Sequence, residues 1–291
     1  MENTVLAYAK INLYLDVVGK RDDGYHDIES IMQTVSLADV VTVDIKKGID
    51  RITQEFIGSD LPCDETNLCY KAAKAYLNFF GDRNCAVHIR VEKNIPEAAG
   101  LAGGSADAAA VIRALDKAFE RCSDTDALCE IGLKVGSDVA FCIVGGTAAV
   151  TGRGERVEKI NTLPEYTVLV VKSELESVST KEAYRRIDEK AVSISREHTF
   201  EEYKKAVSYA DKGIIEKGVY NIFEEVMKDE LPHTQKIIEA MKKSGAQCAL
   251  MSGSGPSVFG LFKDENAAKV ASDTIKKEIG DVFTAVCTTI K

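Results

Sequence analysis

The sequence predicts an α+β fold in two lobes. In the N-terminal half, strand-like segments come before most of the helical ones, which is typical of a sheet with helices packed on one side. The C-terminal end reads as helix, strand, strand, helix and strand, which indicates a second, smaller sheet backed by helices. Because 291 residues exceed the length of most single domains, we expect an N-terminal lobe over residues 1–160 and a C-terminal lobe over residues 161–291.

The first strand is predicted over residues 5–18. Ile11, Leu13 and Leu15 alternate along it and form one face, which places Lys10 and Asn12 together on the other face. A lysine on a strand is usually exposed to solvent, so this face alone does not indicate a site. The period of the sequence predicts these further elements before the first glycine-rich segment: strands at 28–36, 40–46 and 51–57, a helix at 67–80 and a strand at 85–91.

Residues 94–107 join that last strand to an alanine-rich helix, for which Ser105 is the predicted N-cap. Gly100, Gly103 and Gly104 carry no side chain, so backbone N–H groups can close on an anion at the positive end of the helix dipole. This favours a phosphate-binding loop, although the segment is neither a Walker A loop nor a dinucleotide fingerprint. A flexible connection without a ligand is the alternative, and three glycines do not decide between the two.

A second helix is expected at 124–135, and residues 141–151 read as a strand interrupted by a pair of glycines. Asp138 lies between these elements, where a carboxylate is commonly a turn or capping group. Considered alone, Asp138 is therefore not a catalytic candidate.

The C-terminal lobe begins with a strand near residues 166–171. Ser179 and Thr180 then precede a short helix as its predicted N-cap. Residues 189–231 are charged and mostly helical in pattern. The glycine-rich turn at 252–256 lies between two short strands and, considered alone, reads as a hairpin connection.

Composition narrows the class of protein. The net charge of −9 argues against binding to nucleic acid or to anionic lipid, which need a positive surface. No apolar run approaches the roughly 18 residues of a membrane span, and the N-terminus lacks a signal-peptide pattern, so we expect a cytoplasmic protein with no membrane partner. The eight cysteines and four histidines show no metal-binding spacing, which makes a structural zinc site an unfavoured interpretation.

Four segments together match one pattern. Ala-Lys-Ile-Asn-Leu at 9–13, Gly-Tyr-His at 24–26, the glycine-rich segment 96–106 and Gly-Ser-Gly-Pro at 253–256 occur in the order and spacing of the GHMP kinases, a family of small-molecule kinases. The resemblance covers essentially the whole chain. Its most specific part is the run 19–26, Gly-Lys-Arg-Asp-Asp-Gly-Tyr-His, and Val-Ser-Thr-Lys-Glu-Ala-Tyr at 178–184 adds support.

The resemblance implies a two-lobed GHMP kinase fold with a mixed sheet in the N-terminal lobe. It implies that Lys10 and Asp138 are the catalytic pair and that ATP is the phosphate donor. Its phosphate loop corresponds here to Pro96, Glu97, Ala98, Ala99, Gly100, Leu101, Ala102, Gly103, Gly104, Ser105 and Ala106. The substrate contacts that it implies are Asn12, Tyr25, His26, Thr180 and Tyr184, of which the two tyrosines and the histidine hold a cytosine ring.

The implied reaction is transfer of the ATP γ-phosphoryl group to the 2-hydroxyl of a methylerythritol that carries cytidine diphosphate, a step of the non-mevalonate isoprenoid pathway. Mg²⁺ is expected with ATP, but its ligands are not assigned, because Ala106 stands where many relatives have a serine. Tyr8 and Ala140 likewise replace prolines of the pattern. A homoserine- or mevalonate-type kinase, or a catalytically silent nucleotide-binding relative, is the alternative. The protein is expected to be a monomer or homodimer.

Overall fold

The computed structural model describes residues 2–160, 163–190 and 197–291. The chain forms two compact units, each made of segments that are discontinuous in sequence. Unit 1 comprises residues 1–9, 38–97 and 102–145, and unit 2 comprises residues 10–37, 98–101 and 146–291. This division differs from the expected boundary at residue 160, because the long strands β1 (Glu2–Lys20) and β2 (His26–Lys47) contribute residues to both units. That boundary adjoins residues 161–162, which lie outside the described residues.

Unit 1 contains a mixed sheet. β4 (Cys85–Glu92) pairs parallel with β3 (Arg51–Ile57) and antiparallel with the second half of β2. The predicted strand β4 is confirmed with alternating burial: Val87, Ile89 and Val91 are buried, whereas His88 and Arg90 are exposed. One face of this sheet therefore packs into a core and the other meets solvent.

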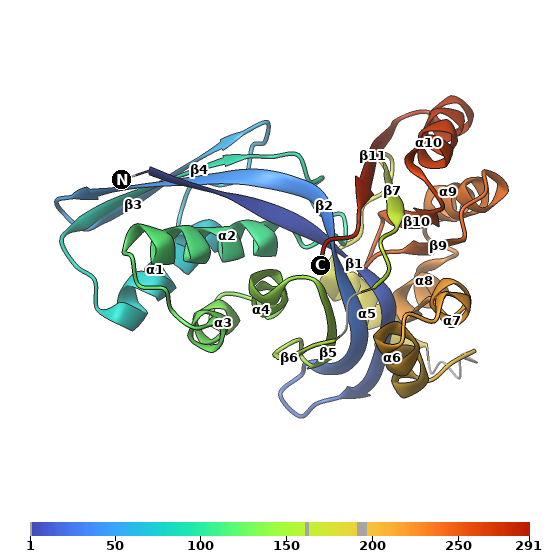
Figure 1. The fold of residues 1–291 in the computed structure, drawn as a ribbon, viewed down its shortest axis with the longest axis horizontal. Helices are drawn as coiled ribbons and strands as arrows, with labels where there is room; N and C mark the ends of the chain where they lie inside the picture. The colour runs from blue at the N-terminus through green and yellow to red at the C-terminus, as the bar shows by residue number, and fades with distance from the viewer. Residues whose placement is uncertain (1, 161–162, 191–196) are drawn as a thin grey trace. The chain divides into compact units, whose positions relative to one another are not determined.

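Four helices of unit 1 lie on one side of this sheet (Figure 1). They are α1 (Leu68–Phe80), α2 (Gly103–Ala118), α3 (Thr125–Leu133) and α4 (Ser137–Val144). The side chains of Asn67 and Asp124 cap α1 and α3 by accepting hydrogen bonds from backbone N–H groups of the first turn. The arrangement confirms the predicted sheet with helices on one side.

Two local predictions in unit 1 are wrong. Ser105 is not the N-cap of α2, because the helix already begins at Gly103, after Ala102 in the left-handed region with a φ of +57°. Residues 141–151 do not form one strand, because residues up to Val144 belong to helix α4. A short apolar run fits a buried helix as well as a strand, and the positive φ of Gly145 separates the two elements here.

Unit 2 begins with the remaining parts of β1 and β2. β5 (Thr147–Gly152) pairs antiparallel with residues 28–33 of β2, and β6 (Arg156–Lys159) pairs antiparallel with β5. The two-residue strand β8 (Tyr220–Asn221) pairs parallel with β1. The inner residues of β1, among them Lys10, are buried.

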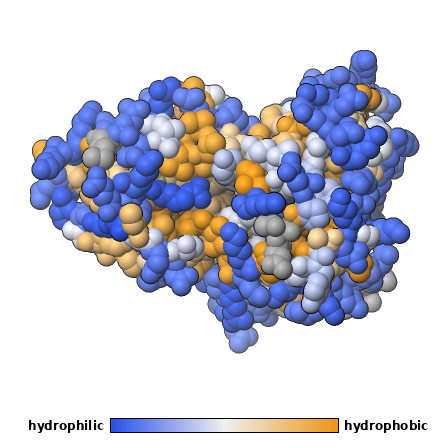
Figure 2. All heavy atoms as spheres, viewed as in Figure 1, coloured by the Kyte–Doolittle hydropathy of each residue, from blue (hydrophilic) through white to orange (hydrophobic). Residues whose placement is uncertain are grey.

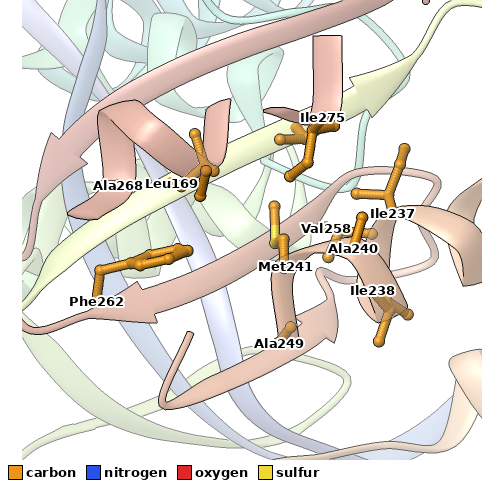
Figure 3. Close-up of a cluster of buried hydrophobic side chains, with 12 residues drawn as sticks. Leu169, Ile237, Ile238, Ala240, Met241, Ala249, Val258, Phe262, Ala268 and Ile275 are labelled. Atoms are coloured by element: carbon orange, nitrogen blue, oxygen red, sulfur yellow. The ribbon is translucent and has the colours of Figure 1, made fainter. Parts of the chain in front are cut away.

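A second, antiparallel sheet lies in unit 2 and has the order β11 (Val282–Thr288), β7 (Thr167–Ser173), β10 (Val258–Phe262) and β9 (Cys248–Met251). Helices α9 (Pro232–Lys243) and α10 (Glu265–Ile279) supply the rest of its core. Figure 3 shows side chains of both helices converging on those of β7, β9 and β10, with Met241 of α9 among them. The outer surfaces of these helices are mostly hydrophilic (Figure 2). The predicted small sheet backed by helices is therefore confirmed.

Four shorter helices complete unit 2: α5 (Thr180–Glu189), α6 (Phe200–Ser208), α7 (Lys212–Lys217) and α8 (Ile222–Met227). Ser179 is the N-cap of α5, as predicted, and accepts a hydrogen bond from Glu182 N. Within the expected charged and helical region, residues 191–196 lie outside the described residues. None of the helices in the described part of the chain combines the length and the hydrophobicity needed to cross a bilayer.

Unit 1 also contains a buried group of three charges, Asp39, Lys93 and Asp107, which we call the lysine cluster. Lys93 Nζ contacts a carboxylate oxygen of Asp39 and lies 2.7 Å from Asp107 Oδ2. The other oxygen of Asp39 accepts a hydrogen bond from Ile95 N at 2.8 Å. A Cβ atom on Gly103 would lie 3.5 Å from Lys93 Nζ. The cluster thus joins the end of β4 to the first turns of α2.

One positive charge faces two carboxylates in the lysine cluster. Burial raises the pKa of Asp107 to about 7, against the opposing effect of Lys93. Burial alone would lower the pKa of Lys93, but the charges of Asp107 and Asp39 outweigh it and raise that pKa. Near neutral pH the positive charge of Lys93 therefore compensates the negative charge of Asp39, and Asp107 is partly protonated.

Replacing Lys93 by Met should destabilise the protein by about 3–5 kcal/mol at neutral pH, because two buried carboxylates would lose their counter-ion. Urea unfolding followed by circular dichroism measures this change in the free energy of unfolding. Lys71→Met, at an exposed position of α1, is the control and should stay within about 0.5 kcal/mol of the parent. Equal stability of the two variants would contradict the role given to the cluster.

The raised pKa of Asp107 predicts a pH dependence of stability. Between about pH 4 and pH 7 the folded protein holds this proton and the unfolded chain releases it, so the contribution of Asp107 to stability decreases as the pH rises. Asp107→Asn should remove this contribution, of up to about 1.4 kcal/mol per pH unit. The test compares unfolding free energies of the parent and the variant at several pH values, and parallel curves would contradict the prediction.

Candidate active site

Two glycine-rich segments pack against each other within unit 2. Gly100 has a φ of +73°, and a Cβ atom on it would lie 2.0 Å from the backbone oxygen of Ser252. Its own carbonyl oxygen accepts a hydrogen bond from Ser252 Oγ at 3.0 Å. Ala99 O accepts another from Ser257 N at 3.3 Å. Only glycine fits at position 100, and residues 252–257, which we call the second glycine turn, are more than a hairpin connection.

Lys10 lies beside this backbone contact. Its side chain is almost fully buried, and Nζ donates hydrogen bonds to Gly100 O at 3.1 Å and to Asn12 Oδ1 at 2.6 Å. Asn12 in turn donates from Nδ2 to Ser30 Oγ at 2.9 Å. Within the described residues of unit 2, no carboxylate forms an ion pair with Lys10. A buried ammonium that is held by neutral oxygens is suited to bind an anionic ligand.

The second glycine turn is held from behind by two residues that the sequence analysis did not identify. Asn221 Nδ2 donates to Met251 O at 2.7 Å and to Gly253 O at 2.8 Å. Glu224 accepts a hydrogen bond from Met251 N at 2.7 Å, and burial raises the pKa of this carboxyl to about 7. Both residues are about 30 positions away in sequence and follow no motif that we recognised, so no local signal identified them.

The expected cytosine contacts Tyr25, His26 and Tyr184 all belong to unit 2. His26, at the start of β2, stacks on Tyr184 of α5 with ring centroids 4.8 Å apart. Phe223 packs edge-on against the same tyrosine at 5.0 Å. Tyr25 is exposed and lies under the guanidinium of Arg153 at 4.8 Å rather than in this stack. The structure therefore brings His26 and Tyr184 together, whereas Tyr25, the residue before His26, lies on the surface.

Thr180, the first residue of α5, hydrogen bonds through its hydroxyl to Ser254 of the second glycine turn at 3.1 Å. This contact connects the helix that carries Tyr184 to the turn that contacts Gly100. Thr180 and Tyr184 therefore lie on one helix that contacts the second glycine turn.

The other expected site residues belong to unit 1. Asp138 is in the first turn of α4, where a carboxylate interacts favourably with the helix dipole. Gly103, Gly104 and Ser105 form the first turn of α2, whose N–H groups are free of intrahelical partners. The pairing of Lys10 with Asp138 stays a prediction, because the two residues belong to different units.

No metal site made by the protein alone is present in the described ranges. Within residues 2–160, 163–190 and 197–291, no three His, Cys, Asp or Glu side chains gather into a group that could hold a metal ion. Mg²⁺ in kinases is usually held by one or two carboxylates together with substrate phosphates.

Comparisons with known families agree with the fold. Residues 67–146 match the GHMP kinases N-terminal domain, and residues 204–280 match the GHMP kinases C-terminal domain. These matches define the class as small-molecule kinases with ATP as the donor. A crystal structure of homoserine kinase from Cytophaga hutchinsonii superposes with a TM-score of 0.76 at 20% identity over 99% of this chain and 94% of that chain, which supports the fold alone.

Closer relatives narrow the class. A 4-diphosphocytidyl-2-C-methyl-D-erythritol kinase of Geobacillus kaustophilus is 42% identical over 97% of this chain and 96% of that protein. The enzyme of the same name from Caldicellulosiruptor bescii is 39% identical, with 97% of each chain covered. A crystal structure of 4-(cytidine 5′-diphospho)-2C-methyl-D-erythritol kinase has a TM-score of 0.78 at 30% identity over 99% of both chains. The chain therefore belongs to the 4-diphosphocytidyl-2-C-methyl-D-erythritol kinase family of GHMP kinases.

Gly100→Ala should disrupt the contact between the two glycine-rich segments, because the new methyl group overlaps the Ser252 backbone. The φ of +73° is also unfavourable for alanine. We expect a loss of stability of about 2 kcal/mol or more and a loss of activity. Thermal unfolding and a kinase assay measure the two effects.

Gly104→Ala is the comparison for folding, because its Cβ would meet only Leu68 Cδ1 at 3.5 Å. This variant should fold as well as the parent. An equally stable Gly100→Ala protein would show that the close backbone approach is unimportant.

Proposed function

We propose that this chain transfers the γ-phosphoryl group of ATP to the 2-hydroxyl of 4-diphosphocytidyl-2-C-methyl-D-erythritol, in the non-mevalonate route to isoprenoid precursors. The family membership supports the reaction. The observation that supports the assignment of this reaction to particular residues is the buried Lys10 ammonium. It lies between Asn12 Oδ1 and the carbonyl oxygen of Gly100 in the glycine loop. A fixed cation at this loop is what a transferring phosphoryl group requires.

The glycine segment 96–106 is the proposed cradle of the ATP phosphates. Backbone N–H groups at the start of α2 donate to phosphate oxygens at the positive end of the helix dipole. Lys10 neutralises charge that develops on the transferring group. Phosphoryl transfer has a loose transition state, so alignment and charge neutralisation account for most of the rate enhancement.

Asp138 is the proposed acceptor of the hydroxyl proton. Asp138 is in the first turn of α4, and the N-cap residue of this helix is Gly136. The carboxylate oxygens of Asp138 are therefore available to orient the attacking hydroxyl. Mg²⁺ bound to the ATP phosphates would supply further charge neutralisation, and no step is assigned to it here.

The cytidine end of the substrate is proposed to bind at Tyr25, His26 and Tyr184. Aromatic rings offer stacking surfaces to a pyrimidine, and the imidazole offers one polar nitrogen to its edge. Asn12 and Thr180 are proposed contacts nearer the acceptor alcohol. A homoserine- or mevalonate-type activity has no support beyond the shared fold, because those solved structures are at most 20% identical to this chain.

The remaining expectations also stand as proposals. The negative net charge supports a small-molecule substrate rather than nucleic acid. A monomer or homodimer and a cytoplasmic location are proposed on the sequence alone.

Asp138→Ala should lower phosphoryl transfer by at least about a thousandfold while ATP still binds, because the carboxylate acts on the acceptor rather than the nucleotide. Transfer from labelled ATP to a panel of alcohols, with the cytidine diphosphate substrate among them, measures activity and specificity together. Calorimetry measures ATP binding.

Near-parental turnover by Asp138→Ala would remove this residue from the mechanism. Turnover of homoserine or mevalonate, without turnover of the cytidine diphosphate substrate, would overturn the proposed reaction.

A further inference from the structure

The two ring nitrogens of His26 have different surroundings. Nε2 lies 2.8 Å from Asp188 Oδ1, at a distance typical of a charge-assisted hydrogen bond. To the residues that the structure describes, Nδ1 makes no hydrogen bond. Asp188 is on α5, four residues after Tyr184, so the helix presents the stacking ring and the carboxylate to the same imidazole.

Asp188 is ionised at neutral pH. Its second oxygen lies 2.6 Å from Lys20 Nζ, and this ammonium, followed by His26, holds the pKa of the carboxyl below its usual value. An ionised carboxylate can only accept hydrogen bonds. The proton of the contact with His26 is therefore on Nε2.

The contact with Asp188 accounts for one ring proton, on Nε2. A neutral ring with a proton on Nε2 has a lone pair on Nδ1. Stacking on Tyr184 fixes the plane of the ring, so the direction of this lone pair is fixed as well.

We infer that Asp188 is a positioning residue that holds His26 in the Nε2–H tautomer, so that Nδ1 accepts a hydrogen bond from the exocyclic amine of the substrate base. This inference rests on the proposed binding of cytidine at His26. Cytosine presents an amine at this edge, whereas uracil presents a carbonyl oxygen, which would face the Nδ1 lone pair. A site built to accept a hydrogen bond rejects an analogue that lacks the donor.

A purely structural role for Asp188 predicts different behaviour. The contacts with Lys20 and His26 also join α5 to the start of β2 and the end of β1. Such partly exposed ion pairs contribute little to stability. A structural role would change binding of cytidine and uridine substrates alike, whereas the tautomer role changes their ratio.

The tautomer can be measured without turnover. Two-bond ¹H–¹⁵N spectra of protein labelled at histidine distinguish protonated from unprotonated ring nitrogens, and the chain has only four histidines. Comparison with His26→Gln assigns the His26 signals. We expect a protonated Nε2 and an unprotonated Nδ1 in the free protein at slightly alkaline pH.

Asp188→Asn should invert this tautomer. Lys20 can only donate, so it selects the amide oxygen of the new side chain and leaves the amide NH₂ facing His26 Nε2. Nε2 then accepts, and the ring proton moves to Nδ1. The same spectrum of the variant measures the change.

Kinetics supply the second arm. The ratio of kcat/KM for the cytidine and the uridine diphosphate forms of the substrate should fall roughly tenfold in Asp188→Ala and further in Asp188→Asn, mainly through KM for the substrate and not for ATP. Glu189→Gln is the control, because its carboxylate pairs with Arg185 and Arg186 on the same helix. This control should keep the parental ratio.

Protonated Nδ1 in the parent protein, or an unchanged tautomer in Asp188→Asn, would overturn the inference. An unchanged ratio in active Asp188 variants would also overturn it. Absence of any turnover by the parent would contradict the proposed function instead, and the spectra would still decide the tautomer.

Discussion

The close approach of two backbones at Gly100 is the constraint on which the rest of unit 2 depends. The Gly100 carbonyl oxygen accepts hydrogen bonds from Lys10 Nζ and Ser252 Oγ, and no side chain fits at its Cα. Strand β1, the glycine loop and the second glycine turn therefore meet at one atom. Because the lysine is buried with neutral oxygens around it, the fold keeps a positive charge at the loop instead of neutralising it internally.

Buried polar groups hold loop backbones within each unit. In unit 1 the lysine cluster joins the end of β4 to the first turns of α2, where the loop N–H groups lie. In unit 2, Asn221 and Glu224 bind the backbone of residues 251–253. Such groups are costly to bury unless every partner is in place, so they also fix a single conformation of the loops. Rigid loops suit a reaction in which alignment contributes most of the catalysis.

Helices and strands were predicted correctly where hydrophobic periodicity or a capping residue gives a local signal. The alternation of β4 and the Ser179 cap of α5 are local signals, and the structure has both. The strand predicted over residues 141–151 was wrong, because the periodicity of a short apolar segment does not distinguish a buried helix from a buried strand. The prediction of Ser105 as N-cap was wrong because the helix begins earlier, after Ala102 in the left-handed conformation. An alanine in the sequence does not indicate that conformation.

The candidate site divides in the same way. Lys10 and Asn12 were predicted to share a face, and their side chains are hydrogen bonded at 2.6 Å. Asn221 and Glu224 act on a turn about 30 residues later, so only the tertiary fold could place them. Asp188 was within reach of sequence reasoning, because it lies one helical turn after Tyr184 and faces the same ring.

In the proposed reaction the Lys10 ammonium neutralises the phosphoryl group during its transfer, which is a catalytic role and not a structural one. The most direct measurement is the turnover number of Lys10→Met with ATP and the cytidine diphosphate substrate, alongside its ATP dissociation constant and thermal stability. We expect a fall in kcat of about 10³-fold or more, with a folded protein and a much smaller change in ATP affinity. A folded Lys10→Met protein that turns over at the parental rate would contradict it.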